Sequence, residues 1–247
     1  AYQGADNNAI GKAAAKYAVN LMRGEGKIVE LYGLKGSTPA IGRHSGFADE
    51  IALHPGMELI AVDYGNWNYD EAYAGADSIF RRHPDVALVY AHNDRMAIAA
   101  SDASRKLGMH PYIIGVDAAP EIGIKAVRDS VIDATFLYPT EGHRLIRTAL
   151  SILKGEPYDS VAQLPIPSPV DLSNADILLL QNESLKEETS KMKSLKNEVD
   201  AYWERHSAQT VILYICIALA VLLCAVVFII LKAYWQRKKY QEVLLRK

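Results

Sequence analysis

The chain has few cysteines, and their placement excludes several classes of protein. Two of the 247 residues are cysteine, Cys216 and Cys224, and both lie in one uncharged apolar segment near the C-terminus. The polar part of the chain therefore has neither a disulfide framework nor a thiolate metal site. Free cysteines commonly behave as small apolar residues, so we expect both to be packing residues.

An excess of basic residues is also lacking. The chain carries 27 Lys and Arg against 29 Asp and Glu, and no basic cluster occurs before its C-terminal end. A nucleic-acid-binding protein normally presents a basic face, so we expect no nucleic-acid partner. No charged and then apolar leader follows Ala1. We therefore expect either a processed chain or a fragment.

Motifs of catalytic and metal sites are missing as well. The seven histidines show neither an HExxH motif nor paired metal-ligand spacing. The stretch "GLKGST" lacks the Lys-Ser/Thr ending of a phosphate-binding loop. No nucleophile and base, and no paired carboxylates, stand in a suitable context. We expect no catalytic residue, no metal and no cofactor in this chain, and we expect His44 and His92 to lie near the rim of a binding site.

A long uncharged run is present near the C-terminus. Residues 211–231, "VILYICIALAVLLCAVVFIIL", form 21 residues without a charge, and as a helix at about 1.5 Å per residue they span roughly the 30 Å of a bilayer core. Basic residues dominate the following segment, 232–247, whereas both signs of charge precede the run. The positive-inside rule places residues 232–247 in the cytoplasm and residues 1–210 outside it.

Residues 173–210, before this run, show a weak heptad pattern. Leu178, Leu185, Met192 and Val199 recur every seven residues, but polar residues occupy the alternate positions. One interpretation is a lone amphipathic helix that packs on its own domain. The other is a parallel coiled-coil stalk of a homodimer that continues into the membrane, which we favour because so polar a helix gains little by folding alone.

Up to about Leu172, apolar β-branched runs alternate with segments of helical spacing. The predicted strands are residues 27–34, 57–64, 86–92, 112–117 and 131–138. The predicted helices are residues 9–23, 39–53, 70–82, 95–107, 120–128 and 140–153. This alternation predicts an α/β fold with a parallel sheet flanked by helices. The proline-rich "QLPIPSPVDL" is expected to be an edge or crossing segment.

Polar or aromatic residues follow each predicted strand. They are Arg43, Trp67, Asn93 with Asp94, Asp117 and Tyr138. The carboxyl ends of parallel strands form one rim, where ligands bind in open α/β sheets. Each residue also has a structural interpretation, since Asp94 and Asp117 can cap helices and Trp67 can anchor a loop.

Several stretches resemble the type I periplasmic sugar-binding proteins, the ribose-binding and LacI-like family. They are "GADNNAIGKAAA", "IVELYGLKGSTPAIGRHSGF", "HPDVALVYAHNDRMAIAA", "IIGVDAAPEIGIKAV" and "DATFLYP". The resemblance implies that Arg43, Trp67, Asn93, Asp117 and Tyr138 contact a sugar. Tyr138 departs from the family, which usually has Gln there. A monosaccharide offers adjacent hydroxyls and an apolar ring face, which suit these side chains.

Family members have two lobes, and this chain matches one of them, so we expect the first lobe to be largely absent. The expected organisation is a sugar-binding lobe at 1–172, a stalk at 173–210, a transmembrane helix at 211–231 and a basic segment at 232–247. This layout resembles the sensor part of a membrane-anchored hybrid two-component histidine kinase in the bacterial inner membrane. The alternative is a membrane-tethered binding protein that delivers sugar to a transporter. The sequence does not distinguish which sugar is bound.

Overall fold

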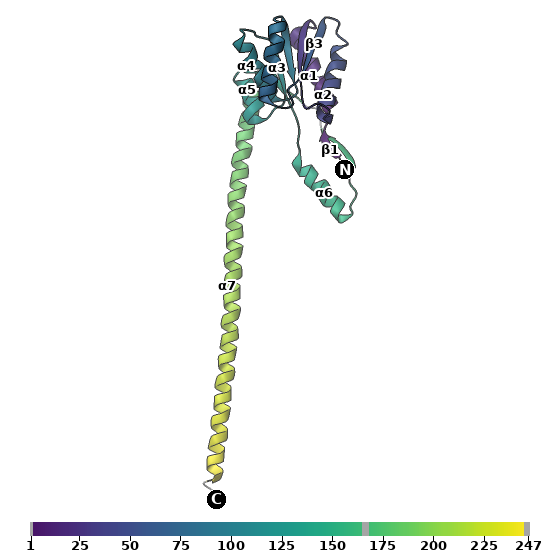
Figure 1. The fold of residues 1–247 in the computed structure, drawn as a ribbon. Coiled ribbons are helices and arrows are strands. Elements are labelled where there is room, and N and C mark those ends of the chain that lie inside the picture. The colour runs from purple at the N-terminus through teal and green to yellow at the C-terminus, as the bar shows by residue number, and fades with distance from the viewer. Residues whose placement is uncertain (1, 165–167, 245–247) are drawn as a thin grey trace. The chain divides into compact units, whose positions relative to one another are not determined.

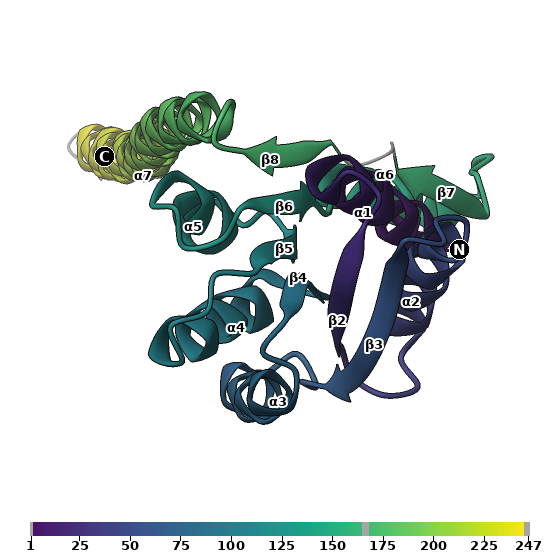
Figure 2. The same cartoon turned by 90° about the horizontal axis from the view of Figure 1, so that it is seen from above.

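The α/β domain is built on a six-stranded sheet, and the computed structural model describes residues 2–164 and 168–244. The strand order is β3-β2-β4-β5-β6-β8, as the ribbon seen from above shows (Figure 2). The pairs from β3 to β6 are parallel, and β8 is antiparallel to β6. The strands are β2 (Gly26–Tyr32), β3 (Met57–Tyr64), β4 (Val86–Ala91), β5 (Tyr112–Asp117), β6 (Ala134–Leu137) and β8 (Pro169–Asp171).

Helices cover both faces of this sheet, as strand–helix alternation requires. On one face lie α1 (Asn7–Met22) and α2 (Thr38–Ile51). On the other lie α3 (Tyr69–Arg82), α4 (Asp94–Lys106), a π-helical turn (Pro120–Ile124) and α5 (Lys125–Arg128). Figure 1 shows this layered arrangement around the sheet. The α/β fold predicted from the sequence is confirmed.

Side-chain alternation along the strands divides the core into two clusters. Ile28 and Leu88 pack with α1 and α2, whereas their neighbours Val29 and Val89 pack with α3 and α4. All four side chains are buried. Successive side chains of a strand point to opposite faces, so a continuous apolar run fits a strand that is covered on both sides.

Two of the predicted strands, residues 57–64 and 112–117, have the predicted bounds. The strand predicted over 131–138 is shorter, because β6 begins at Ala134. Asp133 bends the chain just before it, and its carboxylate accepts a hydrogen bond from the backbone N–H of Ile113 at 2.7 Å. The predicted helix 120–128 begins as a π-helical turn.

A second, two-stranded sheet was not predicted. It pairs β1 (Tyr2–Ala5) in parallel with β7 (Val161–Leu164). Four residues are too few for an alternation pattern to show. The proline-rich segment contributes the end of β7 and the edge strand β8, as expected of proline, while residues 165–167 fall outside the described part.

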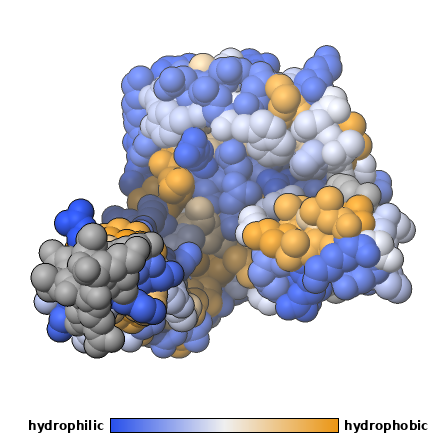
Figure 3. All heavy atoms as spheres, turned by 90° about the horizontal axis from the view of Figure 1, so that it is seen from below, coloured by the Kyte–Doolittle hydropathy of each residue, from blue (hydrophilic) through white to orange (hydrophobic). Residues whose placement is uncertain are grey.

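Helix α6 (Gly142–Lys154) has no buried residue. Its apolar side chains recur at helical spacing and are exposed: Leu145, Ile146, Leu150 and Leu153. The space-filling view from below shows an apolar patch on this part of the molecule (Figure 3). An apolar strip of this kind normally packs against another element of structure.

The last helix, α7 (Ala175–Leu244), continues without a break through the apolar run. The chain divides into two compact units, Ala1–Glu183 and Ser184–Lys247. Within the first unit, Leu178 and Leu179 of α7 pack on the domain core. In the second unit Leu185, Met192 and Val199 are exposed. Among the described residues, α7 is the one helix that is long and apolar enough to cross a membrane.

Candidate functional site

The structure brings all five candidate residues to one cleft. Arg43, Trp67, Asn93, Asp117 and Tyr138 line it together with Ser37 and Pro39, and its volume is about 330 Å³. They come from α2, the β3–α3 loop, the β4–α4 junction, the end of β5 and the residue after β6. The convergence follows from topology, because the carboxyl ends of parallel strands share one edge of the sheet. Their role in binding a ligand stays a prediction.

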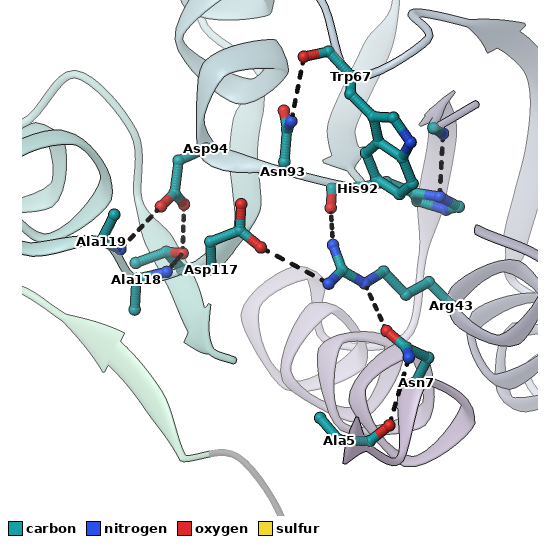
Figure 4. A network of polar contacts seen from close by, with 12 residues as sticks. Ala5, Asn7, Arg43, Trp67, His92, Asn93, Asp94, Asp117, Ala118 and Ala119 are labelled. Atoms are coloured by element: carbon teal, nitrogen blue, oxygen red, sulfur yellow. Dashed lines mark hydrogen bonds and ion pairs between the residues drawn. The ribbon is translucent and has the colours of Figure 1, made fainter. Parts of the chain in front are cut away.

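Arg43 is the centre of the polar network in Figure 4. Its Nε donates to Oδ1 of Asn7 at 3.0 Å, Nη1 donates to the backbone carbonyl of His92, and Nη2 lies 3.5 Å from Oδ1 of Asp117. The side chain is 4% exposed. A buried guanidinium is stable only when its N–H groups are paired. In the described part of the chain no further contact takes up its remaining N–H groups, which can face a ligand.

Two aromatic rings flank Arg43. Its Cζ lies 5.5 Å from the ring centroid of Trp67 and 5.2 Å from that of Tyr138. A guanidinium at such distances is attracted to the negative faces of the rings. Tyr138, the departure from the family pattern, therefore contacts Arg43 with its ring.

The loop that carries Trp67 has an unusual backbone. Asn66 and Trp67 have φ of 48° and 66°, a region that side chains other than Gly rarely adopt. Asn68 caps the following helix, since its side chain accepts from the backbone N–H of Asp70 at 2.7 Å. The capped helix thus holds the strained loop beside the cleft.

Asn93 is the N-cap of α4. Its Oδ1 accepts from the backbone N–H of Met96 at 2.9 Å, and Nδ2 donates to the backbone carbonyl of Trp67 at 3.3 Å. Because one N–H of the amide is already donated to Trp67 and the oxygen already accepts the cap bond, one N–H of Asn93 remains to donate to a ligand.

Asp117 does not cap a helix. The helical turn after it begins at Pro120 and has no side-chain cap. The Asp117 side chain is 43% exposed, and burial raises the pKa of this carboxyl against the opposing charge of Arg43. Its φ of 116° is strained. The arrangement presents a carboxylate to the cleft as a hydrogen-bond acceptor.

Asp94, next to Asn93, points away from the cleft (Figure 4). It is 2% exposed and accepts from the backbone N–H of Ala119 at 3.1 Å and from the hydroxyl of Thr135. Burial, with a smaller effect of Asp117, raises its pKa to about 7. Asp94 therefore links the first turn of α4 to the segment after β5 and to β6, and it is not a helix cap.

Sequence reasoning missed Asn7 as a site residue and misplaced His92. Asn7 stands in the "GADNN" stretch, and it donates to the backbone carbonyl of Ala5 at 3.3 Å as well as accepting from Arg43. His92 was expected at the rim, but it is wholly buried beneath the cleft. A buried polar side chain after an apolar strand gives no local signal that separates it from a rim residue.

The side chains of the site are complementary to a ligand that is rich in hydroxyl groups. Arg43 and Asn93 can donate, Asp117 can accept, and the Trp67 ring offers an apolar surface. Among residues 2–164 and 168–244, no group of three His, Cys, Asp or Glu side chains is arranged to hold a metal ion. A cleft of this volume and lining can accommodate a small polar molecule.

Comparison with known sequences identifies the relatives of the domain. The profile of a family described as "Periplasmic binding protein domain" matches residues 1–157. The ribose import binding protein of Escherichia coli (strain K12) is 32% identical over 171 residues, which are 68% of this chain and 55% of that protein. The D-apiose import binding protein of Actinobacillus succinogenes is 34% identical over 144 residues, 56% of this chain and 43% of that protein. The chain spans about half the length of these curated relatives.

Solved structures give the same result. The fructose-binding periplasmic domain of a hybrid two-component system is 40% identical with a TM-score of 0.77, over 79% of this chain and 66% of that one. A solute-binding protein from Actinobacillus succinogenes with bound D-allose has 24% identity and a TM-score of 0.67, over 70% of this chain and 62% of that one. The second likeness is one of fold alone.

Proposed function

Because the chain belongs to the periplasmic binding protein domain family, we propose that it is the sugar-sensing input part of a membrane-anchored sensor kinase. The observation that carries the proposal is the convergence of Arg43, Trp67, Asn93, Asp117 and Tyr138 on one cleft. Hydrogen bonds to charged groups contribute roughly 1.5–3 kcal/mol each. Arg43 and Asp117 would bind adjacent hydroxyls, and Trp67 would cover the C–H face of the ring.

The names of the relatives support a monosaccharide as the ligand. The two curated relatives are binding proteins for the import of ribose and D-apiose, and the solved structure with 40% identity is a fructose-binding domain. All three sugars are small and carry several hydroxyl groups, which the polar side chains of the cleft can bind. We therefore infer a pentose or hexose as the ligand class.

Helix α7 supports membrane anchoring. It contains the uncharged residues 211–231, and the basic residues that follow are on the cytoplasmic side by the positive-inside rule. Residues 1–210 then lie in the periplasm of a bacterium, and the inner membrane holds the protein by a single span. The exposed seam of Leu185, Met192 and Val199 favours pairing with a second copy of the stalk.

A second lobe is part of this proposal. The exposed apolar strip of α6 lacks cover within the described residues, and the relatives are about twice as long as the matched region. In this proposal another lobe of the full-length protein covers the strip and closes over the sugar. Residues 1–247 alone would then bind sugar weakly or not at all.

Calorimetry on the full-length protein in detergent tests the binding proposal. The ligands to compare are D-ribose, D-fructose, D-allose and D-apiose. Trp67→Ala is expected to weaken binding at least about tenfold, equal to roughly 1.4 kcal/mol, with little change of the melting temperature. Trp203→Ala is the matched control outside the domain. Absence of binding by all four sugars, or equal losses of affinity in both variants, would contradict the proposal.

Asn93→Ala is a less suitable variant, because it also removes the cap of α4.

The reading frame after Lys247 separates sensing from delivery. A kinase core there supports the sensor, as the hybrid two-component relative does. A stop codon supports the alternative of a tethered binding protein that serves a transporter. The functional test of the sensor is autophosphorylation with ATP in inverted membrane vesicles. It is measured with and without the bound sugar. A ligand can change that activity only by as much as it prefers one conformation.

A further inference from the structure

A buried cluster of Glu30, His44 and His92 lies beneath the cleft, on the face of the sheet covered by α1 and α2. Glu30 and His92 are wholly buried. Oε1 of Glu30 lies 2.6 Å from Nε2 of His92, and Oε2 lies 2.7 Å from Nδ1 of His44. The carboxylate is thus shared between a buried and a partly exposed imidazole. None of the sugar-binding roles assigned above uses this cluster.

The hydrogen bonds define the tautomer of His92. The backbone N–H of Gly33 donates to Nδ1 of His92 at 3.1 Å, so Nδ1 is an acceptor and carries no proton. The ring proton is therefore on Nε2 and is donated to Glu30. A neutral ring satisfies both bonds. A protonated ring would direct a second N–H at the N–H of Gly33, and that bond would break.

His92 is linked to two side chains that face the cleft, to Trp67 through Gly33 and to Arg43 through its own backbone carbonyl. The Cα of Gly33 lies so close to the indole of Trp67 that a Cβ on Gly33 would overlap the ring. The rings of Trp67 and His92 are 6.2 Å apart between centroids. The backbone carbonyl of His92 accepts from Nη1 of Arg43 (Figure 4). The ring of His92 therefore holds the Gly33 backbone against Trp67, and its backbone carbonyl accepts a hydrogen bond from Arg43.

Titratable and charged groups surround His92 on every packed element. They are Glu30 and Tyr32 of β2, Tyr90 of β4, and Arg43 and His44 of α2. Burial lowers the pKa of His92 most strongly, and Arg43 and His44 add to the effect, whereas Glu30 opposes it. Burial alone would raise the pKa of Glu30, but the hydrogen bonds from His44 and His92 bring it below its ordinary value. The ring of His92 is thus neutral at neutral pH beside an ionised Glu30.

We propose that His92 is a positioning residue of the sugar site, whose neutral ring holds Gly33 in place under Trp67 and whose protonation in acid releases that support. The backbone carbonyl of the same residue accepts a hydrogen bond from Nη1 of Arg43. Acidification then removes the support of Trp67 in the cleft. The regulation of sugar binding by pH rests on the proposed function, whereas the support of Trp67 does not.

The emission of Trp67 tests this support without any sugar. The chain has three tryptophans, so the variant Trp203→Phe with Trp235→Phe leaves Trp67 as the reporter in the full chain. Between pH 8 and 5, we expect one emission change with a midpoint below about 6.5, the ordinary pKa of histidine, at constant far-UV circular dichroism. His92→Asn keeps an acceptor near the Nδ1 position but cannot be protonated, so it is expected to abolish the change. His92→Gln, which can keep the bond to Glu30, is the second variant if His92→Asn does not fold.

His44→Gln is the matched control, because His44 contacts the same carboxylate but neither Gly33 nor Trp67. It is expected to leave the emission change in place. An unaltered change in both His92 variants, or no change before the circular dichroism signal is lost, overturns the inference. With D-fructose as the probe and the full-length protein, the dissociation constant should rise about tenfold across the same pH range and stay within about twofold in His92→Asn. An emission change that depends on His92, without binding of any sugar, would refute the proposed function and leave the support of Trp67 standing.

Discussion

Nη2 of Arg43 lies 3.5 Å from Oδ1 of Asp117, and the backbone of Asp117 has a φ of 116° where this pair forms. Strained backbone of this kind costs about 1–3 kcal/mol and is concentrated at functional sites. The ion pair, the hydrogen bond to His92 and the contact with Asn7 together hold the strained conformation.

Arg43→Lys should weaken sugar binding by the full-length protein roughly 10- to 100-fold. One ammonium cannot contact Asn7, the His92 carbonyl and Asp117 at once, and it has no planar face to stack between two rings. Loss of one charged hydrogen bond costs roughly 1.5–3 kcal/mol. Calorimetry measures the change, and Arg105→Lys, whose arginine contacts Ser130 outside the cleft, is the control. Equal affinity of Arg43→Lys and the unmodified protein would show that the guanidinium geometry is not used.

The protonation of Asp94 should make the fold more stable in mild acid. Its pKa is about 7 in the folded protein and about 3.9 in an unfolded chain. Between these values the folded state binds a proton that the unfolded state lacks, so the free energy of unfolding falls as pH rises from about 4 to 7. The total change amounts to roughly 1.4 kcal/mol for each unit by which the two pKa values differ.

Urea unfolding of the full chain at pH 5, 6, 7 and 8 measures this effect. Asp94→Asn should lower stability overall and flatten its pH dependence, and the difference between the two proteins isolates Asp94 from the histidines. Glu58→Gln, on the edge strand β3, is the surface control. Parallel pH curves for Asp94→Asn and the unmodified protein would contradict the assignment.

Tyr90→Phe should stabilise the domain. The Tyr90 hydroxyl is buried without a hydrogen-bond partner in the described part of the chain, and its ring stacks on Phe47 with centroids 4.1 Å apart. An unpaired buried hydroxyl costs about 1–3 kcal/mol, and Phe removes it while keeping the stacked ring. Thermal unfolding should show a melting temperature higher by roughly 2–4 °C per kcal/mol. Phe47→Leu, which removes the stacking partner, should lower it. A fall with Tyr90→Phe would mean that the hydroxyl has an unseen partner.

The sequence predicted the sheet well and the site in part. The apolar run of β4 (Val86–Ala91) defines a strand because two covered faces favour apolar residues along its length, whereas the edge strand 57–64 includes Glu58 and Asp63 and is mostly not buried. The topological rule then gathers the strand ends at one rim. The domain boundaries predicted at 172, 210 and 231 stay predictions.

The detail of the site depends on contacts that no local pattern contains. The N-cap role of Asn93 was open to prediction from its place before a helix, but its bond to the Trp67 carbonyl was not. The partners of Asp94 lie 25 and 41 residues away along the chain. The sandwich of Arg43 between two rings likewise depends on how three separate segments pack.

The fixed position of Arg43 has an entropic consequence for recognition. A free arginine side chain has about 2 kcal/mol of rotamer entropy to lose when it is immobilised. Here Asn7, the His92 carbonyl and Asp117 already restrain the side chain, so that loss occurs when the domain folds and not when the ligand arrives. A preorganised donor of this kind lets more of each new hydrogen bond appear as affinity.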